Sequence, residues 1–269
     1  MHLTFCPLFS SSSGNCTYVG TDRIGLLVDA GVSGARVEKE LREIGVDPYT
    51  LSAILVTHEH TDHIYGVGVL SRRYDLPIYA TAGTWEGLSR RAGSIQPKNR
   101  IVIDGNEDFY IGDMMIRPFR TAHDAAESCG YIIGVGRASV AIATDIGCVR
   151  QGWVNAVDGA DIVLLESNYD PAMLQASSYP YELKRRIAST KGHLSNDDAG
   201  RAAVELVKRG VRTIMLGHLS RENNFPELAY QSVAAALSEA GLTPDTGDGP
   251  TILLCEKDRH SAVHRLDAD

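Results

Sequence analysis

Short apolar runs bounded by turn-forming residues recur along the whole chain, and this pattern predicts β-strands. The runs expected to be strands are residues 23–31, 53–58, 76–81, 114–123, 138–145, 161–167, 212–218 and 251–255. Apolar residues three or four positions apart indicate amphipathic helices between several of these runs. The expected helices run from Ser33 to Gly45, from Ser195 or Asn196 to Gly210, from Pro226 to Gly241, and over about 64–73.

Strands dominate both halves of the sequence, and helices lie between them. This alternation predicts an α/β fold in which two sheets pack face to face beneath outer helices. No internal repeat, low-complexity tract or linker rich in proline and glycine divides the sequence. We therefore predict a single domain over residues 1–269.

The composition, with 43% hydrophobic and 22% charged residues, is that of an ordinary soluble globular protein. The sequence shows no basic segment followed by a long apolar run, and no stretch approaches the roughly 18 apolar residues of a membrane span. Five scattered cysteines without a CxxC pair agree with a reducing compartment. We therefore expect a cytoplasmic protein with no membrane partner. The net charge of −8 argues against general binding of polyanions.

The segment VTHEHTDHIYGVG, residues 56–68, concentrates candidate chemistry, because three of the nine histidines fall within six residues of it. His58 and His60 are two apart on an extended strand end, so they project to the same side and can share one cation. Asp62 and His63 follow in a turn and can hold a second cation. Two ions roughly 3.5–4 Å apart are the usual two-metal hydrolytic arrangement. Glu59 is expected to point away into solvent.

Further polar residues each end or closely follow an apolar strand run. They are His123, Asp145, Glu166 and His218. A strand directs its last residue out of the core while the sheet holds its backbone rigid, so such residues can converge on one edge of the sandwich.

The segment THEHTDH resembles the HxHxDH motif of the metallo-β-lactamase superfamily. TAHDA (121–125), ATDIG (143–147) and LGHLSRENN (216–224) follow in the order which that superfamily uses. The resemblance implies the four-layer αββα sandwich with two divalent metal ions. By the same resemblance, one ion would be bound by His58, His60 and His123, the other by Asp62, His63 and His218, and both by a bridging Asp145. Ligation by histidine and aspartate alone suits Zn²⁺, Mn²⁺ or Fe²⁺.

Two further segments, LLESNY (164–169) and KGHLSNDDAGRAA (191–203), resemble paired elements of ribonuclease Z and related nucleases. The resemblance implies that Glu166 orients His193, which protonates the leaving oxygen of a phosphodiester. FSSSSGNC (9–16), residues 60–81, GTWEGL (83–88) and GHLSRENN (217–224) are similar to the WalJ/YycJ group of compact exonucleases. There is little room for the arm by which ribonuclease Z grips tRNA, or for the extra domain of β-CASP nucleases.

These resemblances imply a dinuclear-metal-dependent phosphodiesterase that acts on nucleic acid, with a metal-activated water as nucleophile. A DNA exonuclease is favoured over an enzyme acting on RNA, with Asp62, His193 and Glu166 as catalytic residues. A phosphodiesterase of cyclic nucleotides is an alternative. A glyoxalase II-like thioesterase leaves Glu166 and His193 unexplained, and a metal-stabilised regulatory protein would be indicated by a missing ligand. The oligomeric state is not predicted.

Candidate substrate-binding residues lie in three places. The serine-rich stretch 10–15 is either a flexible turn or a holder of phosphate or metal-bound water. Asn223 and Asn224 either line the site's rim or cap the helix at Pro226. The basic run just before His193 is either a solvated helix face or a contact to the phosphate backbone. The residues concerned are Ser12, Ser13, Asn15, Asn223, Asn224, Lys184, Arg185 and Lys191, with Arg186 in the same run.

Overall fold

The computed structural model describes all residues from 1 to 269. The chain divides into two compact units, each of which is made of segments from different parts of the sequence. Unit 1 comprises residues 1–120, 125–139 and 256–269, and unit 2 comprises residues 121–124 and 140–255. Neither unit is continuous in the sequence, so the units are not successive domains. The prediction of one domain over residues 1–269 stays a prediction.

Unit 1 contains a seven-stranded sheet in the order β14-β1-β2-β3-β4-β5-β6. Antiparallel pairing joins β14, β1, β2 and β3, and parallel pairing continues from β3 to β6. Strands β7, β8 and β9 of the same unit pair as an antiparallel meander. The strands are β1 (His2–Ser11), β2 (Gly14–Gly20), β3 (Gly25–Val28), β4 (Leu51–Leu55), β5 (Ile78–Thr81), β6 (Arg100–Ile103), β7 (Phe109–Ile111), β8 (Met114–Arg120), β9 (Cys129–Val135) and β14 (His264–Asp267).

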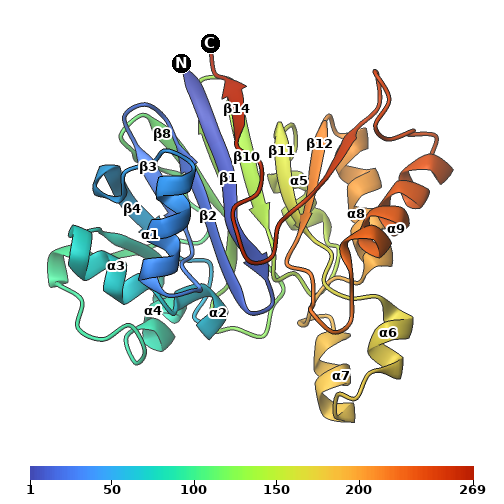
Figure 1. Cartoon of the computed structure of the whole chain (residues 1–269), viewed down its shortest axis with the longest axis horizontal. Coiled ribbons are helices and arrows are strands. Elements are labelled where there is room, and N and C mark those ends of the chain that lie inside the picture. The colour runs from blue at the N-terminus through green and yellow to red at the C-terminus, as the bar shows by residue number, and fades with distance from the viewer. The chain divides into compact units, whose positions relative to one another are not determined.

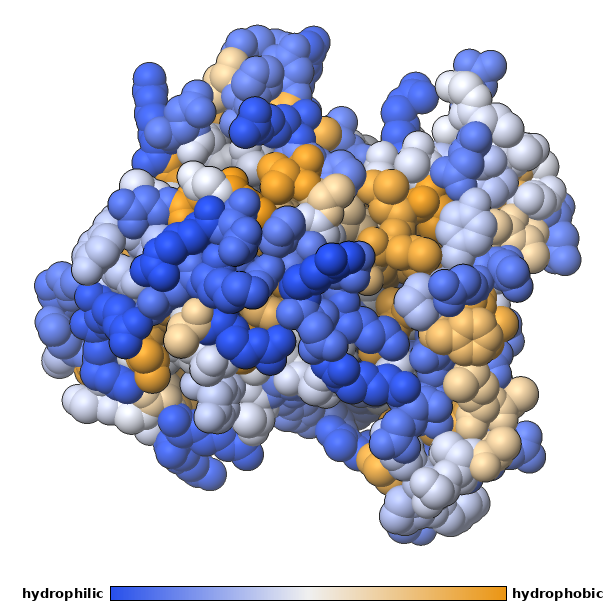
Figure 2. Space-filling model, in the orientation of Figure 1, coloured by the Kyte–Doolittle hydropathy of each residue, from blue (hydrophilic) through white to orange (hydrophobic).

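The helices of unit 1 cover its seven-stranded sheet, as Figure 1 shows for α1, α3 and α4. Their apolar sides enter one core, in which Val37, Leu41, Leu70 and Trp85 are fully or almost fully buried. Burial of each such side chain contributes about 1.5–3 kcal/mol. The outer surface over α1 is hydrophilic (Figure 2). The helices are α1 (Gly34–Glu43), η1 (Pro48–Thr50), α2 (Thr61–Ile64), α3 (Val67–Tyr74), α4 (Ala82–Leu88) and η2 (Pro97–Asn99).

The serine-rich stretch, predicted to be a flexible turn or a binding loop, forms the tip of the β1–β2 hairpin. Ser10 and Ser11 are buried in β1, and only Ser12 and Ser13 are exposed, in a two-residue turn. The pattern did not reveal these strands because β1 contains Pro7 and β2 begins with Gly14 and Asn15, and these residue types are depleted in strands. The register shifts between Pro7 and the second residue after it, and such a bulge accommodates proline.

The helix predicted over about 64–73 is broken at Gly66 into α2 and α3. Gly66 donates its N–H to the carbonyl of Ala30 at 2.7 Å. A Cβ atom at this position would lie 2.3 Å from the carbonyl oxygen of Val32. The close backbone contact with another loop therefore interrupts the helix, although the apolar spacing continues through it.

Unit 2 is built on parallel strands in the order β10, β11, β12, β13. Because parallel strands run the same way, their carboxyl ends meet at one edge, where sites of α/β proteins gather. The strands are β10 (Ala138–Ala143), β11 (Ile162–Glu166), β12 (Thr213–Gly217) and β13 (Thr251–Leu254). The helices are α5 (Gln151–Ala156), α6 (Pro171–Ala176), α7 (Tyr181–Ile187), α8 (Asn196–Lys208) and α9 (Pro226–Glu239).

Helices α8 and α9 lie side by side in unit 2 and confirm the predicted segments. The N-cap of α8 is Ser195, whose hydroxyl accepts the N–H of Asp198 at 3.1 Å. Gly210 and Gly241, which follow the two helices, have positive φ angles of 98° and 76°. None of the helices combines the length and apolar character that crossing a bilayer requires.

Helices α6 and α7 project from the rest of unit 2 (Figure 1), and α7 contains no buried residue. The Lys184 ammonium group joins them, donating to the carbonyls of Gln175 and Ser177 at 2.7 Å each. These carbonyls lie at the end of α6, so the lysine fastens the two helices together.

We expect Gly31→Ala to destabilise the protein by about 1–3 kcal/mol or more, as overpacking does. A Cβ atom at Gly31 would lie 1.6 Å from the carbonyl oxygen of Asp62. The matched control is Gly152→Ala in α5, where no atom lies within 4 Å and alanine should stabilise the helix by about 0.5–1 kcal/mol. Urea unfolding of both variants measures the difference, and equal midpoints would contradict the prediction.

Candidate metal centre

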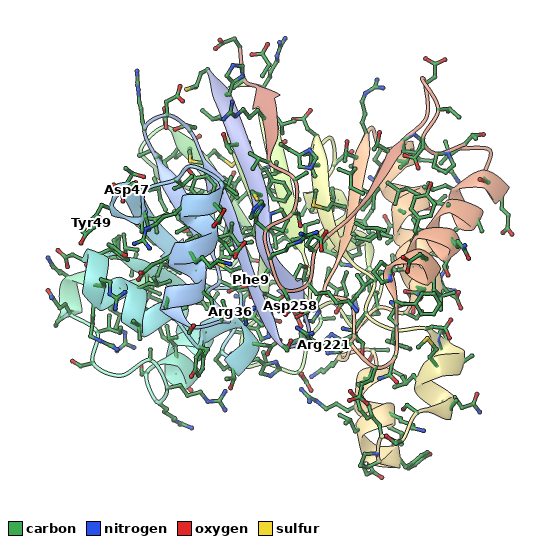
Figure 3. All side chains as sticks on the ribbon, in the orientation of Figure 1. Phe9, Arg36, Asp47, Tyr49, Arg221 and Asp258 are labelled. Atoms are coloured by element: carbon green, nitrogen blue, oxygen red, sulfur yellow. The ribbon has the colours of Figure 1, made fainter.

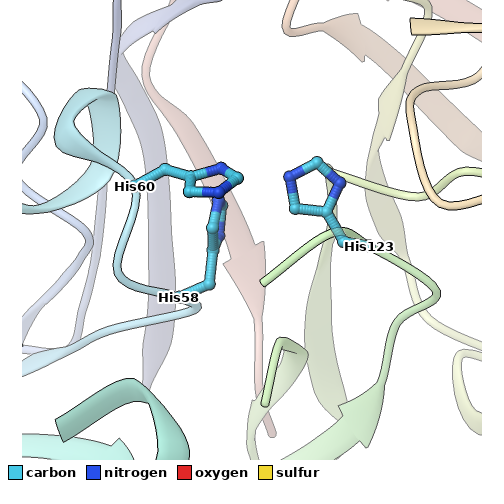
Figure 4. Close-up of side chains that lie close together, drawn as sticks. All are labelled: His58, His60 and His123. Carbon is cyan, nitrogen blue, oxygen red and sulfur yellow. The ribbon is translucent and has the colours of Figure 1, made fainter. Parts of the chain in front are cut away.

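The histidines after β4 lie close together in unit 1. The ring of His58 is centred 4.6 Å from that of His60 and 4.1 Å from that of His63. Figure 4 shows His58 and His60, which share the loop before α2. His60 is the N-cap of α2, and Asp62 and His63 lie inside this short helix. The extended segment thus turns after His60, where the sequence predicts a turn before Asp62 and His63.

A buried aspartate, Asp29, holds this group from behind. Its Oδ2 accepts the Nδ1–H of His63 at 2.7 Å and the hydroxyl of Thr57 at 2.8 Å. Its Oδ1 accepts the N–H of Thr57 at 2.8 Å, and the Thr57 hydroxyl lies 3.0 Å from Nδ1 of His58. Sequence reasoning missed Asp29, although it ends the apolar part of the first predicted strand, residues 23–31, and carries the same strand-end signal as Asp145.

The side chain of Asn15 reaches the Asp62–His63 pair from the β1–β2 hairpin. Its Nδ2 lies 3.1 Å from Nε2 of His63 and 3.5 Å from Oδ2 of Asp62. Nε2 of His63 and Oδ2 of Asp62 are themselves 3.4 Å apart. The structure therefore places Asn15 beside two predicted metal ligands, whereas Ser12 and Ser13 are exposed at the hairpin tip.

Glu59 was predicted to point into solvent, but its side chain is only partly exposed and contacts the protein. Its Oε1 accepts the N–H of Ala126 at 2.9 Å, and its side chain packs against Gly87, where a Cβ atom would meet it at 2.2 Å. Glu59 therefore anchors the histidine loop within unit 1.

In unit 2, the ligand atoms of Asp145, Glu166, His193 and His218 all lie within 4.8 Å of one another. Glu166 is the last residue of β11 and His218 directly follows β12. Asp145 and His218 have the rare positive φ angles of 56° and 54°. Such backbone strain is typical of functional sites, where the surrounding structure fixes it.

The fully buried carboxylate of Glu166 orients two imidazoles at once. Its Oε1 accepts the Nδ1–H of His193 at 2.7 Å and that of His218 at 2.8 Å. Its Oε2 accepts the N–H groups of Ile146 and Leu194 at 2.9 and 3.2 Å. Burial alone would raise the pKa of Glu166, but the two imidazoles hold that pKa below its ordinary value. Glu166 is therefore an ionised acceptor at neutral pH.

His123, on the loop after β8 and labelled in Figure 4, belongs to unit 2. Its Nδ1 donates to the carbonyl of Gly192 at 3.0 Å, and its Nε2 lies 3.5 Å from Oδ1 of Asp145. His193 lies 3.7 Å from the same carboxylate oxygen. The side chain of His193 is 18% exposed, whereas that of His218 is fully buried. Solvent can therefore reach His193.

The donor groups fit divalent cations. In four of the predicted ligands, Nδ1 lies within hydrogen-bond distance of a protein oxygen. A proton on Nδ1 leaves the lone pair on Nε2 for a metal ion. These ligands are His58, His63, His123 and His218. Metal-binding histidines are held by such oxygen acceptors. The predicted ligand set contains imidazoles and carboxylates without a thiolate, which suits Zn²⁺, Mn²⁺ or Fe²⁺. The chain thus carries His and Asp groups suitable for a dinuclear metal site.

Comparison with known proteins agrees with this chemistry. Residues 25–218 match the family model of the beta-lactamase superfamily domain. The chain belongs to the beta-lactamase superfamily. It is 41% identical to exodeoxyribonuclease YycJ of Bacillus anthracis, over 90% of this chain and 91% of that protein. It is 40% identical to exodeoxyribonuclease WalJ of Streptococcus pneumoniae, over 87% of this chain and 88% of that protein.

Among solved structures, the metallo-β-lactamase fold protein YhfI from Bacillus subtilis matches with a TM-score of 0.73. At 17% identity, the match covers 98% of this chain and 100% of that one, and it shows the fold alone. The predicted metallo-β-lactamase α/β fold is therefore confirmed, as is the resemblance to the WalJ/YycJ group.

Asn223 and Asn224, the two asparagines that were predicted to bind substrate, are both buried. Asn224 donates its amide to the carbonyl of Ser167 and to Oδ1 of Asn196, both at 2.8 Å. Its polar groups thus serve a structural network. Asn223 is only 1% exposed, and its side-chain amide has no hydrogen-bond partner within the chain. Of the two residues, Asn223 alone keeps an amide suited to a ligand.

The predicted basic run is only partly available to a substrate. Lys184 joins α6 to α7, and Arg186 forms an ion pair with Asp124, next to His123. Arg185 lies over the ring of Tyr181 at 5.7 Å and remains exposed, as does Lys191. The sequence could not separate these roles, because a charge run says nothing about partners far along the chain.

Proposed function

We propose that this protein is a metal-dependent phosphodiesterase that degrades DNA as an exonuclease, with DNA favoured over RNA. The observation that carries the proposal is the pair formed by Glu166 and His193 beside Asp145. The relatives named exodeoxyribonuclease YycJ and WalJ, at 41% and 40% identity over most of their length, support it.

We propose two divalent ions, Zn²⁺, Mn²⁺ or Fe²⁺, as cofactors. Such ions, when bound, lower the pKa of a water molecule and offset phosphate charge. The ligands would be His58, His60 and His123 for one ion, Asp62, His63 and His218 for the other, and Asp145 for both. Asp62 would thereby also take part in catalysis. The oxygen acceptors behind Nδ1 of His58, His63, His123 and His218 support this assignment.

His193 would protonate the leaving oxygen of the phosphodiester. Because its Nδ1–H is donated to Glu166, the second proton of the imidazolium sits on Nε2, from which it can be transferred. The carboxylate of Glu166 stabilises the positive ring before the transfer and fixes the neutral tautomer after it. An alkoxide needs such a donor, whereas a thiolate leaves readily without one. The pair therefore favours phosphodiester cleavage over thioester hydrolysis.

Digestion of end-labelled DNA and RNA by metal-reconstituted protein tests the proposed function. An exonuclease releases mononucleotides or short products from one end from the first time point, and the label position gives the polarity. Internal fragments of intermediate length would instead indicate an endonuclease. Hydrolysis of cyclic nucleotides without cleavage of any polymer would replace the proposal by a small-molecule phosphodiesterase.

The exposed cations Arg185 and Lys191 are expected to bind the phosphate backbone. The double variant Arg185→Gln/Lys191→Gln should raise KM for long DNA several-fold and reduce the salt slope of binding by about 1–2. Lys184 and Arg186 are left intact because they hold α6 and Asp124.

The matched control is Lys39→Gln/Arg90→Gln, which removes the same charge from exposed positions of unit 1. Its salt dependence should equal the parent's, and hydrolysis of bis(p-nitrophenyl) phosphate should be unchanged in both double variants. Equal KM values for DNA in the two double variants would show that this run does not bind the substrate.

A further inference from the structure

A pocket of about 530 Å³ opens in unit 1 beside Asp62, one of the proposed metal ligands. Its volume falls in the range of small-molecule sites. Its lining includes the hairpin tip, Gly31 and the start of α2, and the backbones of Gly31 and Asp62 are in close contact, since a Cβ at Gly31 would lie 1.6 Å from the Asp62 carbonyl oxygen. The pocket is therefore a built feature of this unit.

Hydroxyl groups line one side of the pocket. Ser12 and Ser13 contribute from the hairpin tip, and Ser33 contributes from the start of α1. Ser33 occupies the N-cap of α1, yet its side chain makes no capping hydrogen bond. The N-terminal end of this ten-residue helix carries partial positive charge. Donors and helix end together favour an anion.

The guanidinium group of Arg36 also lines the pocket. Arg36 lies over the ring of Phe9 at 4.6 Å, and its Nη2–H donates to the carbonyl of Asp258 at 3.3 Å. Figure 3 labels the three residues. The carboxylate of Asp258 is 3.7 Å away, in a pair whose side chains are about half exposed. Such an exposed pair is weak. Arg36 is thus oriented by the protein and keeps donors for a phosphate.

An aromatic ring completes the pocket. Tyr65 follows α2, three residues after Asp62, and is 65% exposed although it lines the pocket. Exposed aromatic rings beside cations are the stacking surfaces on which unpaired bases bind. Phosphate and base can therefore be recognised within one pocket.

We propose that this pocket binds the nucleotide next to the scissile phosphodiester. Tyr65 stacks on the base, and Arg36 binds the phosphate together with the hydroxyls of Ser12, Ser13 and Ser33. The inference rests on the proposed function, because Asp62 connects the pocket with the metal ligands. Stacking accepts every base, so binding at this site is tolerant of sequence.

Isothermal titration calorimetry of the metal-loaded full chain with thymidine 3′,5′-bisphosphate measures the affinity of the proposed nucleotide site. Tyr65→Ala should weaken binding roughly 5- to 150-fold, and Tyr65→Phe should restore it. Arg36→Gln should weaken it about tenfold or more. Inorganic phosphate, which has no base, should bind the parent and Tyr65→Ala alike. The control is Tyr49→Ala, at a tyrosine that is 76% exposed elsewhere on unit 1 (Figure 3).

Unchanged nucleotide affinity in Tyr65→Ala and Arg36→Gln would refute the proposed nucleotide site. An equal loss of phosphate binding and nucleotide binding in Tyr65→Ala would also refute it. Thermal unfolding of each variant verifies that it is folded. Digestion of DNA by the parent separates the two proposals. If the parent cleaves DNA but the variants do not change nucleotide binding, the nuclease proposal is kept and the proposed nucleotide site is refuted. Nucleotide binding that depends on Tyr65, without cleavage of any polymer, supports the pocket and removes the nuclease.

Discussion

Asp145→Asn is expected to lose bound metal and phosphodiesterase activity together. One carboxylate would serve both ions, and its Oδ1 already lies 3.5 Å from Nε2 of His123. Asparagine tolerates the positive φ of 56° at this position, so the fold should be kept. Since bound ions would supply several kcal/mol of transition-state stabilisation, we expect a loss of about 10³-fold or more in kcat.

The measurement is metal content per chain after reconstitution, together with turnover of DNA and of bis(p-nitrophenyl) phosphate. The parent should hold two ions. Asp75→Asn is the matched control, because Asp75 also has a positive φ, of 54°, and lies at the C-cap of α3. It should keep both ions and the parent's rate. Parental metal content and turnover in Asp145→Asn would refute the bridging role.

His193→Ala should keep its metal ions and lose roughly 10²–10⁴-fold in kcat on DNA. The loss should be much smaller on bis(p-nitrophenyl) phosphate, because p-nitrophenolate leaves without protonation. This difference between substrates is what a proton donor predicts and what a general disturbance of the site does not.

His2→Ala serves as a control at an exposed histidine and should change neither substrate's turnover. An unchanged rate on DNA in metal-replete His193→Ala would remove the general acid from the proposed mechanism. An equal loss on both substrates would point instead to a positioning role.

The candidate site could be predicted from the sequence because polar residues follow visible apolar runs. Asp145, Glu166 and His218 come at or just after strands of one parallel sheet, and parallel strands bring their ends to one edge. The resemblance to the superfamily motif supplied the remaining ligands. Neither source required knowledge of distant contacts.

The rest depended on tertiary contacts. Asp29 supports His63 across 34 positions, and Arg186 reaches Asp124 across 62. Strands β1 and β2 were not predicted because they contain Pro7, Gly14 and Asn15, residue types depleted in strands, which here are accommodated by a bulge and by the pairing of the two strands. Such partners are fixed only when the chain is folded.

The projecting helix α7 is a segment of this chain that another sequence could replace. Tyr169 and Ser195 form a β-bridge, which closes the base of the segment between them. With the base closed, doubling the length of such a segment costs only about 0.6 kcal/mol. Since α7 buries no residue, helices of other lengths or charges could replace 181–187 without opening the core, whereas the buried Leu174 of α6 would have to be kept. Grafted segments could thus redirect the enzyme to new polymers while Glu166 and His193, on either side of the insertion, keep their chemistry.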